Sequence, residues 1–432
     1  MVAEQRKFVE GIGQIPSAWE VKSADEVSLK ITKGTTPPKA DIVDHQEIPF
    51  LRVNNLGFNG AIDKKSDFIF VSRSAHEGFL ARSRAYPGDI LMNIVGPPLG
   101  KVSLLGDEFS EYNMNQAIVI YRLVDGVIHR DFFIAYLLSD TAQQWLQSRS
   151  KKTSGQQNLT IELCKGLPVP VPALDEQQKI AQILSTWDKA IATTEQLLAN
   201  SQQQKKALMQ QLLTGKKRLM DQNGVRFSGE WNELALEKIF IFKKGKELSK
   251  ADLSESGKNK CILYGELYTK YTEVIETIHS RTDQDKGTPS LADDILIPSS
   301  TTTSGLDLAN ATAVLEDNVL LGGDINILRP KKKISAPFFS HLLTHIKKYE
   351  IASRAQGITI IHLYASDLKD IRVLAPSDLF EQQKVAAVLS TADQEIMFLQ
   401  QKLDALKQEK KALMQQLLTG KRRVVLNAKE AT

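Results

Sequence analysis

The sequence predicts an α+β protein in which two mixed α/β domains are joined by two long antiparallel coiled-coil helices, with an internal pseudo-two-fold repeat. Three observations lead to this class. A segment of 41 residues occurs at 176–216 and again at 381–421, and 25 of the 41 positions are identical. Both copies space their apolar residues as heptads. Each copy is preceded by about 120 residues of short β-branched runs broken by Gly, Pro, Asn and Asp, as in strand-rich domains.

The repeated segment is predicted to form a long helix in each copy. Asp175 and Asp378 have capping spacing, and Gly215 and Gly420 stand where a helix would end in a left-handed residue. Some 40 residues at 1.5 Å each give a helix about 60 Å long. Such a helix must bury its apolar stripe, and two matched stripes favour mutual pairing. Packing of each helix on its own domain is the alternative.

Two lysines predict the direction of the pair. Lys205 and Lys410 occupy equivalent seam positions in the two copies. A parallel, in-register pair would place these like charges face to face where little water reaches. We therefore expect antiparallel helices, with a pseudo-two-fold axis that carries the preceding domains to opposite ends.

The chain order is then domain, helix, domain, helix. We expect an N-terminal domain at 1–172, a first helix at 173–216, a second domain at 217–377, and a second helix with a C-terminal tail at 378–432. The two domains are distantly related, since each begins near a Trp and reaches Lys-Gly fourteen or fifteen residues later. Helices are also expected near 130–147 and 336–350.

Composition permits a nucleic-acid partner without demonstrating one. The chain has 55 Lys and Arg against 51 Asp and Glu, a net charge of +4. Cys164 and Cys261 have no Cys-x-x-Cys spacing, which indicates a reducing compartment and neither a disulfide framework nor a zinc site. The sequence shows no signal peptide and no apolar run of membrane-spanning length, so we expect a cytoplasmic protein.

Several motifs carry a resemblance over essentially the whole chain. They are "EQQKI" and "LMQQLLTGK" at the helix ends, "PGDILMNIVG" and "SGQQNLT" in the first domain, and "LYGELYTKY", "GDINILRP" and "AQGITIIHL" in the second. The sequence resembles the DNA-specificity (S) subunit of type I restriction-modification systems, which act in anti-phage defence. The resemblance implies two target recognition domains, each reading one half of a split asymmetric DNA sequence, and two helices that set the gap between the halves.

The resemblance also implies partners that carry the chemistry. These would be two modification subunits that bind S-adenosylmethionine and methylate adenine, and restriction subunits that use ATP and Mg²⁺. The sequence itself shows no catalytic site: neither "TTPPKA" (35–40) nor "GPPLGK" (96–101) matches the Pro-Pro-aromatic motif of amino-methyltransferases. "GPPLGK" is also too short for a phosphate-binding loop, so we interpret it as a tight turn. We therefore expect a non-catalytic chain that binds no cofactor.

One further pattern concerns metal binding. His341 and His345 have zinc-compatible spacing in "HLLTH", but Leu342 stands where a metalloprotease has its general-base Glu. We interpret the two as helix-surface histidines and expect no metal site.

Candidate DNA contacts are polar residues in loops, because amides and guanidinium groups read base edges while Lys, Arg and hydroxyl groups bind phosphate. Lys33-Gly34 and Lys244-Gly245 take equivalent positions in the two domains, as do Ser154-Gly155 and Gln356-Gly357. In the first domain the candidates are Lys33, Thr35, Thr36, Lys39, Arg52, Asn54, Asn55, Asn113, Asn115, Gln116, Lys151, Lys152, Ser154, Gln156 and Gln157. In the second they are Lys243, Lys244, Lys246, Tyr264, Tyr268, Lys270, Ser299, Ser300, Thr301, Arg354, Gln356 and Thr359.

Two other functions remain open from the sequence. The chain could be a two-headed DNA-binding repressor or architectural protein without methylation partners, since heptads would serve it equally well. It could also be a coiled-coil adaptor that binds only proteins. Duplex-DNA binding with a steep salt dependence separates the adaptor from the other two.

Overall fold

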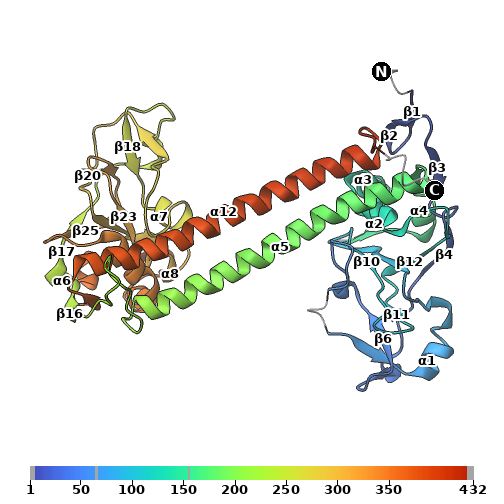
Figure 1. Cartoon of the computed structure of the whole chain (residues 1–432), viewed down its shortest axis with the longest axis horizontal. Coiled ribbons are helices and arrows are strands. Elements are labelled where there is room, and N and C mark those ends of the chain that lie inside the picture. Colours follow the sequence, from blue (N-terminus) through green and yellow to red (C-terminus); the bar gives the residue numbers. More distant parts are fainter. Residues whose placement is uncertain (1–4, 64–66, 154–155, 426–432) are drawn as a thin grey trace. The chain divides into compact units, whose positions relative to one another are not determined.

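The computed structural model describes residues 5–63, 67–153 and 156–425 (Figure 1). The chain divides into two compact units. Unit 1 contains 1–194 and 402–432, and unit 2 contains 195–401. Each unit therefore consists of one head, the N-terminal part of the long helix that follows this head, and the C-terminal part of the other long helix. Below, the first head is 5–171 and the second head is 231–376.

Two long helices dominate the chain, α5 (Leu174–Leu212) and α12 (Leu379–Leu418). Both end as predicted: Gly215 and Gly420 have φ of +70° and +62°, a left-handed conformation that suits glycine. At the N-termini only one cap is as expected. The Asp378 carboxylate accepts the backbone N–H of Phe380, whereas α5 begins before Asp175, which therefore lies inside its first turn.

Each unit contains an antiparallel pair of helix segments. In unit 1, Lys410 of α12 forms an ion pair with Asp188 of α5. In unit 2, Lys205 of α5 forms one with Asp393 of α12. Each lysine thus faces an aspartate, which confirms the antiparallel direction predicted from the lysines. The two ion pairs are also equivalent under the sequence repeat, because Asp393 and Lys410 lie 205 positions after Asp188 and Lys205.

The start of each helix is fastened to the end of the other by a buried glutamate. In unit 1, Glu176 accepts hydrogen bonds from Arg423 Nε (2.6 Å) and Nη2 (2.8 Å) and from Trp19 Nε1 (3.1 Å). The guanidinium also lies over the Trp19 ring, 5.8 Å from its centroid. In unit 2, Glu381 binds Arg218, whose Nη2 lies 2.6 Å from Oε2. This arrangement again follows the offset of 205 residues.

The first head contains two four-stranded sheets, with strand orders β10-β8-β12-β4 and β11-β6-β7-β5. The first is antiparallel throughout; in the second, β11 and β6 are parallel. The strands are β1 (Arg6–Val9), β2 (Gly13–Pro16), β3 (Glu20–Ser23), β4 (Ser28–Lys33), β5 (Ile42–Val43), β6 (Ile48–Leu51), β7 (Ile69–Val71), β8 (Ile90–Asn93), β9 (Val95–Gly96), β10 (Val102–Leu104), β11 (Asn113–Met114), β12 (Ile118–Leu123), β13 (Lys151–Thr153), β14 (Gln156–Asn158) and β15 (Pro168–Val171). The helices are α1 (Arg73–Glu77), α2 (Arg130–Leu138), α3 (Asp140–Ser148) and α4 (Ile161–Lys165).

The second head repeats this plan, with sheets β17-β25-β21-β23 and β19-β18-β24-β20 and a parallel pair of β18 and β24. The strands are β16 (Trp231–Ala235), β17 (Phe240–Lys244), β18 (Asn259–Ile262), β19 (Ser280–Thr282), β20 (Thr288–Pro289), β21 (Asp294–Pro298), β22 (Ser300–Thr301), β23 (Thr312–Val314), β24 (Leu320–Leu321), β25 (Ile325–Pro330), β26 (Ile361–His362) and β27 (Arg372–Pro376). The helices are α6 (Leu236–Ile239), α7 (Glu266–Thr269), α8 (Gly305–Leu308), α9 (Ala336–His341), α10 (Lys348–Ser353) and α11 (Ala365–Leu368), and a π-helical turn covers Leu342–Ile346.

The long helices contribute to the core of each head. In unit 1, Ile180 and Leu184 of α5 and Leu417 of α12 are buried together with Phe132 and Phe133 of α2. In unit 2, a core of the same kind takes in side chains from both long helices as well as from α9. The burial of these apolar side chains fixes each head to its own helix segments.

Candidate nucleic-acid interface

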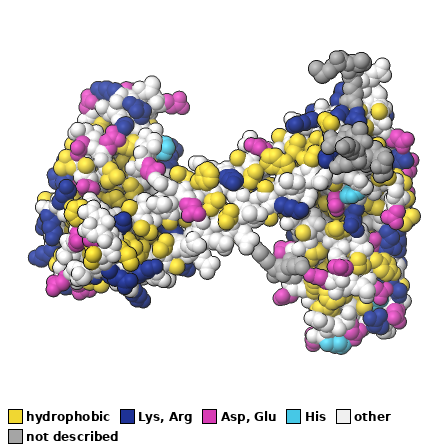
Figure 2. Space-filling view, in the orientation of Figure 1, with side chains coloured by type: hydrophobic (Ala, Val, Ile, Leu, Met, Phe, Trp, Pro, Cys, Tyr) yellow, Lys and Arg dark blue, Asp and Glu magenta, His cyan; other side chains and the backbone are white. Residues whose placement is uncertain are grey.

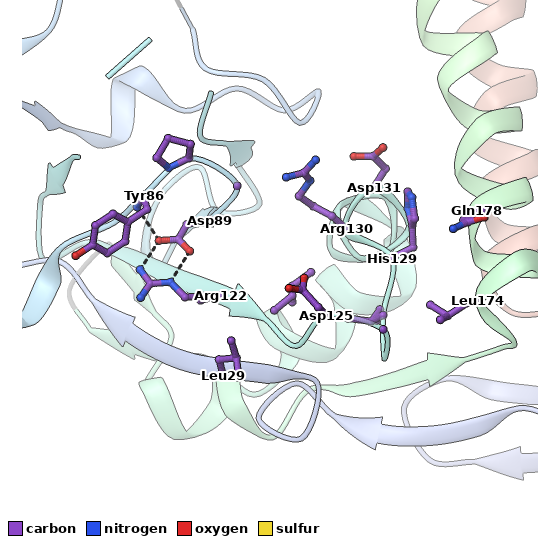
Figure 3. A pocket seen from close by; sticks show the side chains of 15 residues that line it. Leu29, Tyr86, Asp89, Arg122, Asp125, His129, Arg130, Asp131, Leu174 and Gln178 are labelled. Carbon is purple, nitrogen blue, oxygen red and sulfur yellow. Dashed lines mark hydrogen bonds and ion pairs between the residues drawn. The ribbon is translucent and has the colours of Figure 1, made fainter. Parts of the chain in front are cut away.

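An aspartate–arginine fork stands at the same place in the central sheet of both heads. Nε and Nη2 of Arg122 donate to the Asp89 carboxylate at 2.9 and 2.7 Å (Figure 3). Arg329 and Asp294 repeat these bonds at the same two distances. In each fork, the hydrogen bonds to the carboxylate raise the pKa of the arginine. The central sheets of the two heads therefore share one arrangement of strands, and equivalent loops leave from equivalent strand ends.

The candidate loops at Lys33-Gly34 and Lys244-Gly245 make equivalent backbone contacts in the two heads. The N–H of Gly34 donates to Ile118 O at 2.8 Å, and that of Gly245 donates to Ile325 O at 2.9 Å. A Cβ on Gly34 would lie 2.2 Å from the Met114 carbonyl oxygen, and a Cβ on Gly245 would lie 1.9 Å from a backbone oxygen. Neither position has room for a side chain. The preceding lysine is exposed in both heads.

The candidate segments of the first head meet at one end of its central sheet. Next to the contact of Gly34 with the start of β12, the N–H of Ile94 donates to Ala117 O at 2.8 Å. The β13–β14 hairpin joins the same end because β14 pairs with β9. The N–H of Asn115 donates to Leu51 O at 2.9 Å, so the loop after β6 lies there too. Segments far apart in sequence thus form one polar surface.

Exposure separates the candidates of the first head. The exposed ones are Lys33, Thr36, Lys39, Asn54, Gln116, Lys151 and Gln156, and the half-buried ones are Arg52, Asn115 and Gln157. The buried ones are Thr35, Asn55 and Asn113. Lys152 belongs to β13, its side chain lies outside the described atoms, and Ser154 lies outside the described residues. Among the exposed group, the Thr36 hydroxyl accepts a hydrogen bond from Asn115 Nδ2 at 3.3 Å.

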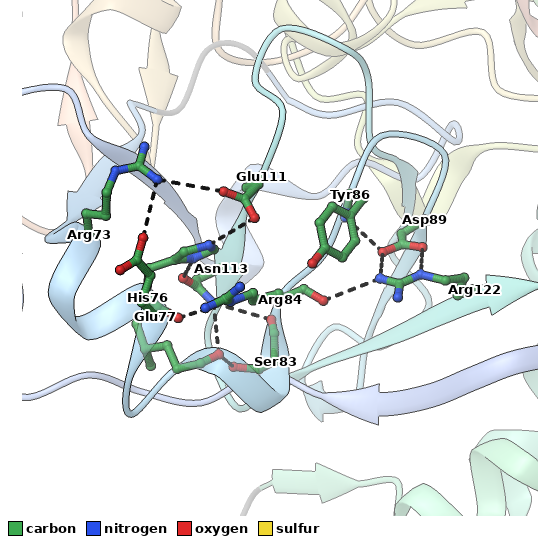
Figure 4. Close-up of polar contacts among 11 residues, drawn as sticks. Arg73, His76, Glu77, Ser83, Arg84, Tyr86, Asp89, Glu111, Asn113 and Arg122 are labelled. Atoms are coloured by element: carbon green, nitrogen blue, oxygen red, sulfur yellow. Dashed lines mark hydrogen bonds and ion pairs between the residues drawn. The ribbon is translucent and has the colours of Figure 1, made fainter.

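Two candidate contacts of the first head, Asn113 and Asn55, are buried in this structure. Asn113 is fully buried, its Oδ1 lies 2.6 Å from His76 Nδ1, and its Nδ2 donates to the Leu80 and Ser83 carbonyl oxygens at 3.3 and 3.4 Å (Figure 4). Asn55 is also fully buried, and its Oδ1 accepts the Arg52 N–H at 2.8 Å. Both amides hold loops in place inside the head and are not presented at its surface.

The second head brings its candidates together at the corresponding sheet end. The N–H of Lys246 donates to Leu321 O at 3.3 Å, and that of Leu363 donates to Ser299 O at 3.0 Å. The pairing of β22 with β26 places 299–301 beside the loop at 354–360. Beside the loop after β17 there is a hollow of about 640 Å³ whose lining includes Tyr264, Tyr268 and Lys270.

Exposure again divides these residues. The exposed candidates are Lys243, Lys244, Lys246, Tyr264, Lys270, Gln356 and Thr359. Tyr268 and Arg354 are half-buried, and Arg354 forms an ion pair with Asp370 at 3.2 Å. Ser299, Ser300 and Thr301 are almost fully buried, at 6%, 5% and 2% exposure. The exposed candidates of this head are therefore mainly lysines, Tyr264 and the loop at 356–359.

Sequence reasoning missed two cations at the first of these surfaces. Lys101 donates to Val53 O at 3.1 Å and lies 5.7 Å from the centroid of the Phe58 ring, which is 56% exposed. Arg82 donates from Nε to Thr35 Oγ1 at 3.2 Å. Lys101 ends the "GPPLGK" turn, so its position in sequence was a usable signal. Nothing in the local sequence marks Arg82.

Other parts of the surface carry both acidic and basic side chains and lack the uniform positive charge that favours DNA binding. A hollow of about 780 Å³ in unit 1 is lined by Asp125, Asp131 and Arg130 together with Leu174 at the start of α5 (Figure 3). On the face shown in Figure 2, Lys and Arg side chains are interspersed with Asp and Glu. Charge alone therefore does not locate the interface, and the converging loops define it better.

Comparison with known proteins identifies the family to which this chain belongs. The model of a family described as type I restriction modification DNA specificity domain matches this chain twice, at residues 16–200 and 228–408. The chain belongs to this family, and it is a type I DNA-specificity protein.

Two curated relatives cover almost the whole chain, and both are from Methanocaldococcus jannaschii. The putative type I restriction enzyme MjaX specificity subunit is 26% identical over 96% of each chain. The type I restriction enzyme MjaVIII specificity subunit is 24% identical over 98% of this chain and 96% of its own.

Solved structures share the fold. The S subunit of a type I restriction-modification system from M. genitalium has a TM-score of 0.58 at 18% identity and covers 99% of this chain and 100% of its own. The HsdS subunit from Thermoanaerobacter tengcongensis has a TM-score of 0.51 at 16% identity, over 96% and 100%. A chain from a study of complex assembly and conformational transition of the type I R-M system has a TM-score of 0.56 at 16% identity, over 94% and 99%. Within the described ranges, the helices of this chain carry no apolar stretch that would span a bilayer.

Proposed function

We propose that this chain is the specificity subunit of a type I restriction-modification complex in which each head reads one half of a bipartite, asymmetric DNA target. The main support is the equivalence of the two heads. Both carry the same aspartate–arginine fork and the same Lys-Gly turn, while the loops around that turn differ in sequence. Two heads that share these structural features but differ in the sequence of their loops are suited to bind two different half-sites.

The candidate contacts divide by chemistry. Exposed lysines at the turns, Lys33 in one head and Lys244 in the other, would neutralise phosphates and fix the position of each head. Amides such as Asn54, Gln116 and Gln356 would read base edges, because an amide both donates and accepts hydrogen bonds. These assignments rest on exposure and loop convergence.

The chemistry would belong to partner subunits. We propose that two modification subunits bind S-adenosylmethionine and methylate adenine, and that restriction subunits use ATP with Mg²⁺ to cut unmodified DNA. This chain would supply recognition and bind no cofactor itself. The sequence has no Pro-Pro-aromatic motif and no complete phosphate-binding loop, which supports this division.

Coexpression with the cognate modification subunit, followed by sequencing of methylated adenines across the genome, tests the proposal. One bipartite target with a fixed unread gap should be methylated, and methylation should require this chain. The isolated chain should turn over neither S-adenosylmethionine nor ATP. Methylation of a single continuous sequence, or turnover by the isolated chain, would contradict the proposal.

A further inference from the structure

Two histidines and a glutamate come together on one side of the second head, in unit 2. Potential ligand atoms of Glu273, His341 and His345 all lie within 4.8 Å of one another. His341 and His345 lie on one helical segment, and their rings are stacked with centroids 6.1 Å apart. Glu273 comes from the loop after α7, and its own carbonyl oxygen accepts the N–H of Ala313 at 2.9 Å. The cluster thus joins two separately anchored parts of the head.

His341 is not the helix-surface residue that its spacing suggested. Its side chain is fully buried, and neither ring nitrogen has a hydrogen-bond partner. Buried polar groups are nearly always hydrogen-bonded or bound to a ligand, because an unsatisfied one destabilises the fold. The unpartnered ring of His341 is therefore a candidate metal ligand. The π-helical turn Leu342–Ile346 begins directly after it, and such turns are frequent at functional sites.

We propose that Glu273, His341 and His345 form a zinc site in the second head, with a water molecule as the fourth ligand. Zinc binds imidazole nitrogen and carboxylate oxygen at about 2.0–2.2 Å in tetrahedral geometry, which places its ligand atoms roughly 3.3–3.5 Å apart. His345 Nε2 is hydrogen-bonded to Glu273 Oε1 in the structure, so zinc would enter by replacing that direct contact. The side chain of His345 is 25% exposed, which leaves an approach from solvent.

Lys205 opposes metal binding, because its Nζ lies 3.7 Å from Glu273 Oε1. It also forms a closer ion pair with Asp393, whose carboxylate compensates its charge. Counting Asp393, two carboxylates face one ammonium group before any metal is bound. The negative charge of the two carboxylates therefore exceeds the positive charge of Lys205, which favours binding of a divalent cation.

The first head provides an internal contrast. Aligning Phe132-Phe133 with Phe338-Phe339 puts Ala135 and Ser139 at the positions of His341 and His345. Neither side chain is a zinc ligand of the usual kind. The proposed site is therefore a property of the second head alone, and at most one zinc ion is expected for each chain.

The test is zinc binding by the full-length chain after treatment with a chelator. His341→Leu is the most informative variant: because the buried imidazole makes no hydrogen bond, an apolar side chain of similar size should keep the fold. We expect one Zn²⁺ per wild-type chain, and affinity at least about 100-fold lower in His341→Leu and in His345→Ala, since even the partners that orient a ligand are worth 10–100-fold. Cobalt substituted for zinc should give the visible absorption of a tetrahedral site.

His45→Ala is the matched control, because His45 is an exposed histidine of the first head. It should bind zinc as the wild type does. Circular dichroism checks that the variants are folded, and Glu273→Gln replaces any histidine variant that is not. Absence of stoichiometric binding by the wild type, or unchanged affinity in folded His341→Leu, His345→Ala or Glu273→Gln chains, would overturn the proposal.

Discussion

The surroundings of two equivalent lysines show what the repeat keeps and what it changes. Lys410 in unit 1 pairs with Asp188, whose side chain is 46% exposed, beside an open hollow of about 240 Å³. Lys205 in unit 2 pairs with Asp393 but also contacts Glu273 of the second head. The helix-to-helix ion pair is the same in both units, while the head facing it is different.

This contrast separates two kinds of constraint. The lysine–aspartate pairs between the helices follow the offset of 205 residues. The pair at the helix ends, Glu176–Arg423, follows it too, since its equivalent is Glu381–Arg218. The contact of Lys205 with Glu273 of the second head has no counterpart among the described contacts of Lys410. A chain whose heads read different half-sites needs loops that can differ while the ion pairs of the helices are kept.

The largest effect is expected from breaking the frame at the helix ends. Glu381→Ala would leave Arg218 without its buried carboxylate partner, and Glu176→Ala would do the same to Arg423. Removing one member of a buried pair destabilises by about 3 kcal/mol. Glu176→Ala should cost more, because Trp19 Nε1 also loses its acceptor, whereas Trp231 Nε1 has no partner in the structure. Urea unfolding of the full chain measures both, and equal losses would argue against the extra role of Trp19.

A second test compares the lysines themselves. Lys205→Met should destabilise by about 2 kcal/mol, because it leaves two largely buried carboxylates, Glu273 and Asp393, without their shared cation. Lys410→Met should cost about 1 kcal/mol or less, since Asp188 is well exposed. The free energies of unfolding of the two variants give the difference directly. A larger loss for Lys410→Met would reverse the comparison.

The sequence predicted the helical frame well. The heptads, the repeated segment and the terminal glycines are signals that the sequence shows directly. The antiparallel direction followed from the cost of placing Lys205 opposite Lys410. One capping detail was wrong, because Asp175 lies within α5 while Glu176 is engaged by Arg423.

The sequence could not place the polar residues of the heads. Asn113 looked like a surface amide in "NMNQ", but it lies on β11, which pairs in parallel with β6, a partner more than 60 positions earlier. His341 looked exposed for a similar reason, since its burial depends on packing that helical spacing does not reveal. Burial in both cases depends on parts of the chain that are distant in sequence, by strand pairing for Asn113 and by packing for His341, and no local pattern encodes it.

A third prediction concerns the length of α5. Repeating "QLLT" (211–214) before Gly215 adds about 6 Å and a little more than one turn to the helix. Since base pairs rise about 3.4 Å, the unread gap of the proposed target should lengthen by one or two base pairs. Methylation of the original target should fall by about tenfold, equal to about 1.4 kcal/mol. Sequencing of methylated adenines measures both, and full activity at the original gap would show that α5 does not set the spacing.

The smallest effects are expected from single lysines at the two equivalent turns. Lys33→Ala and Lys244→Ala should each weaken DNA binding a few-fold for all sequences and lower the salt slope by about one. Lys30→Ala is the control, because Lys30 lies earlier on β4 and donates to Arg82 O. Binding by the complex across salt concentrations decides the point. A change of sequence preference in Lys33→Ala would assign that lysine to base reading.

The central claim is that the heads read independently on a shared frame, and a head exchange tests it most directly. Residues 17–150 would be replaced with the matching segment of a relative, and methylated adenines would be sequenced after coexpression with the modification subunit. We expect one half-site to change while the other half-site and the gap between them stay the same. A change in both half-sites, or in the gap, would contradict the account.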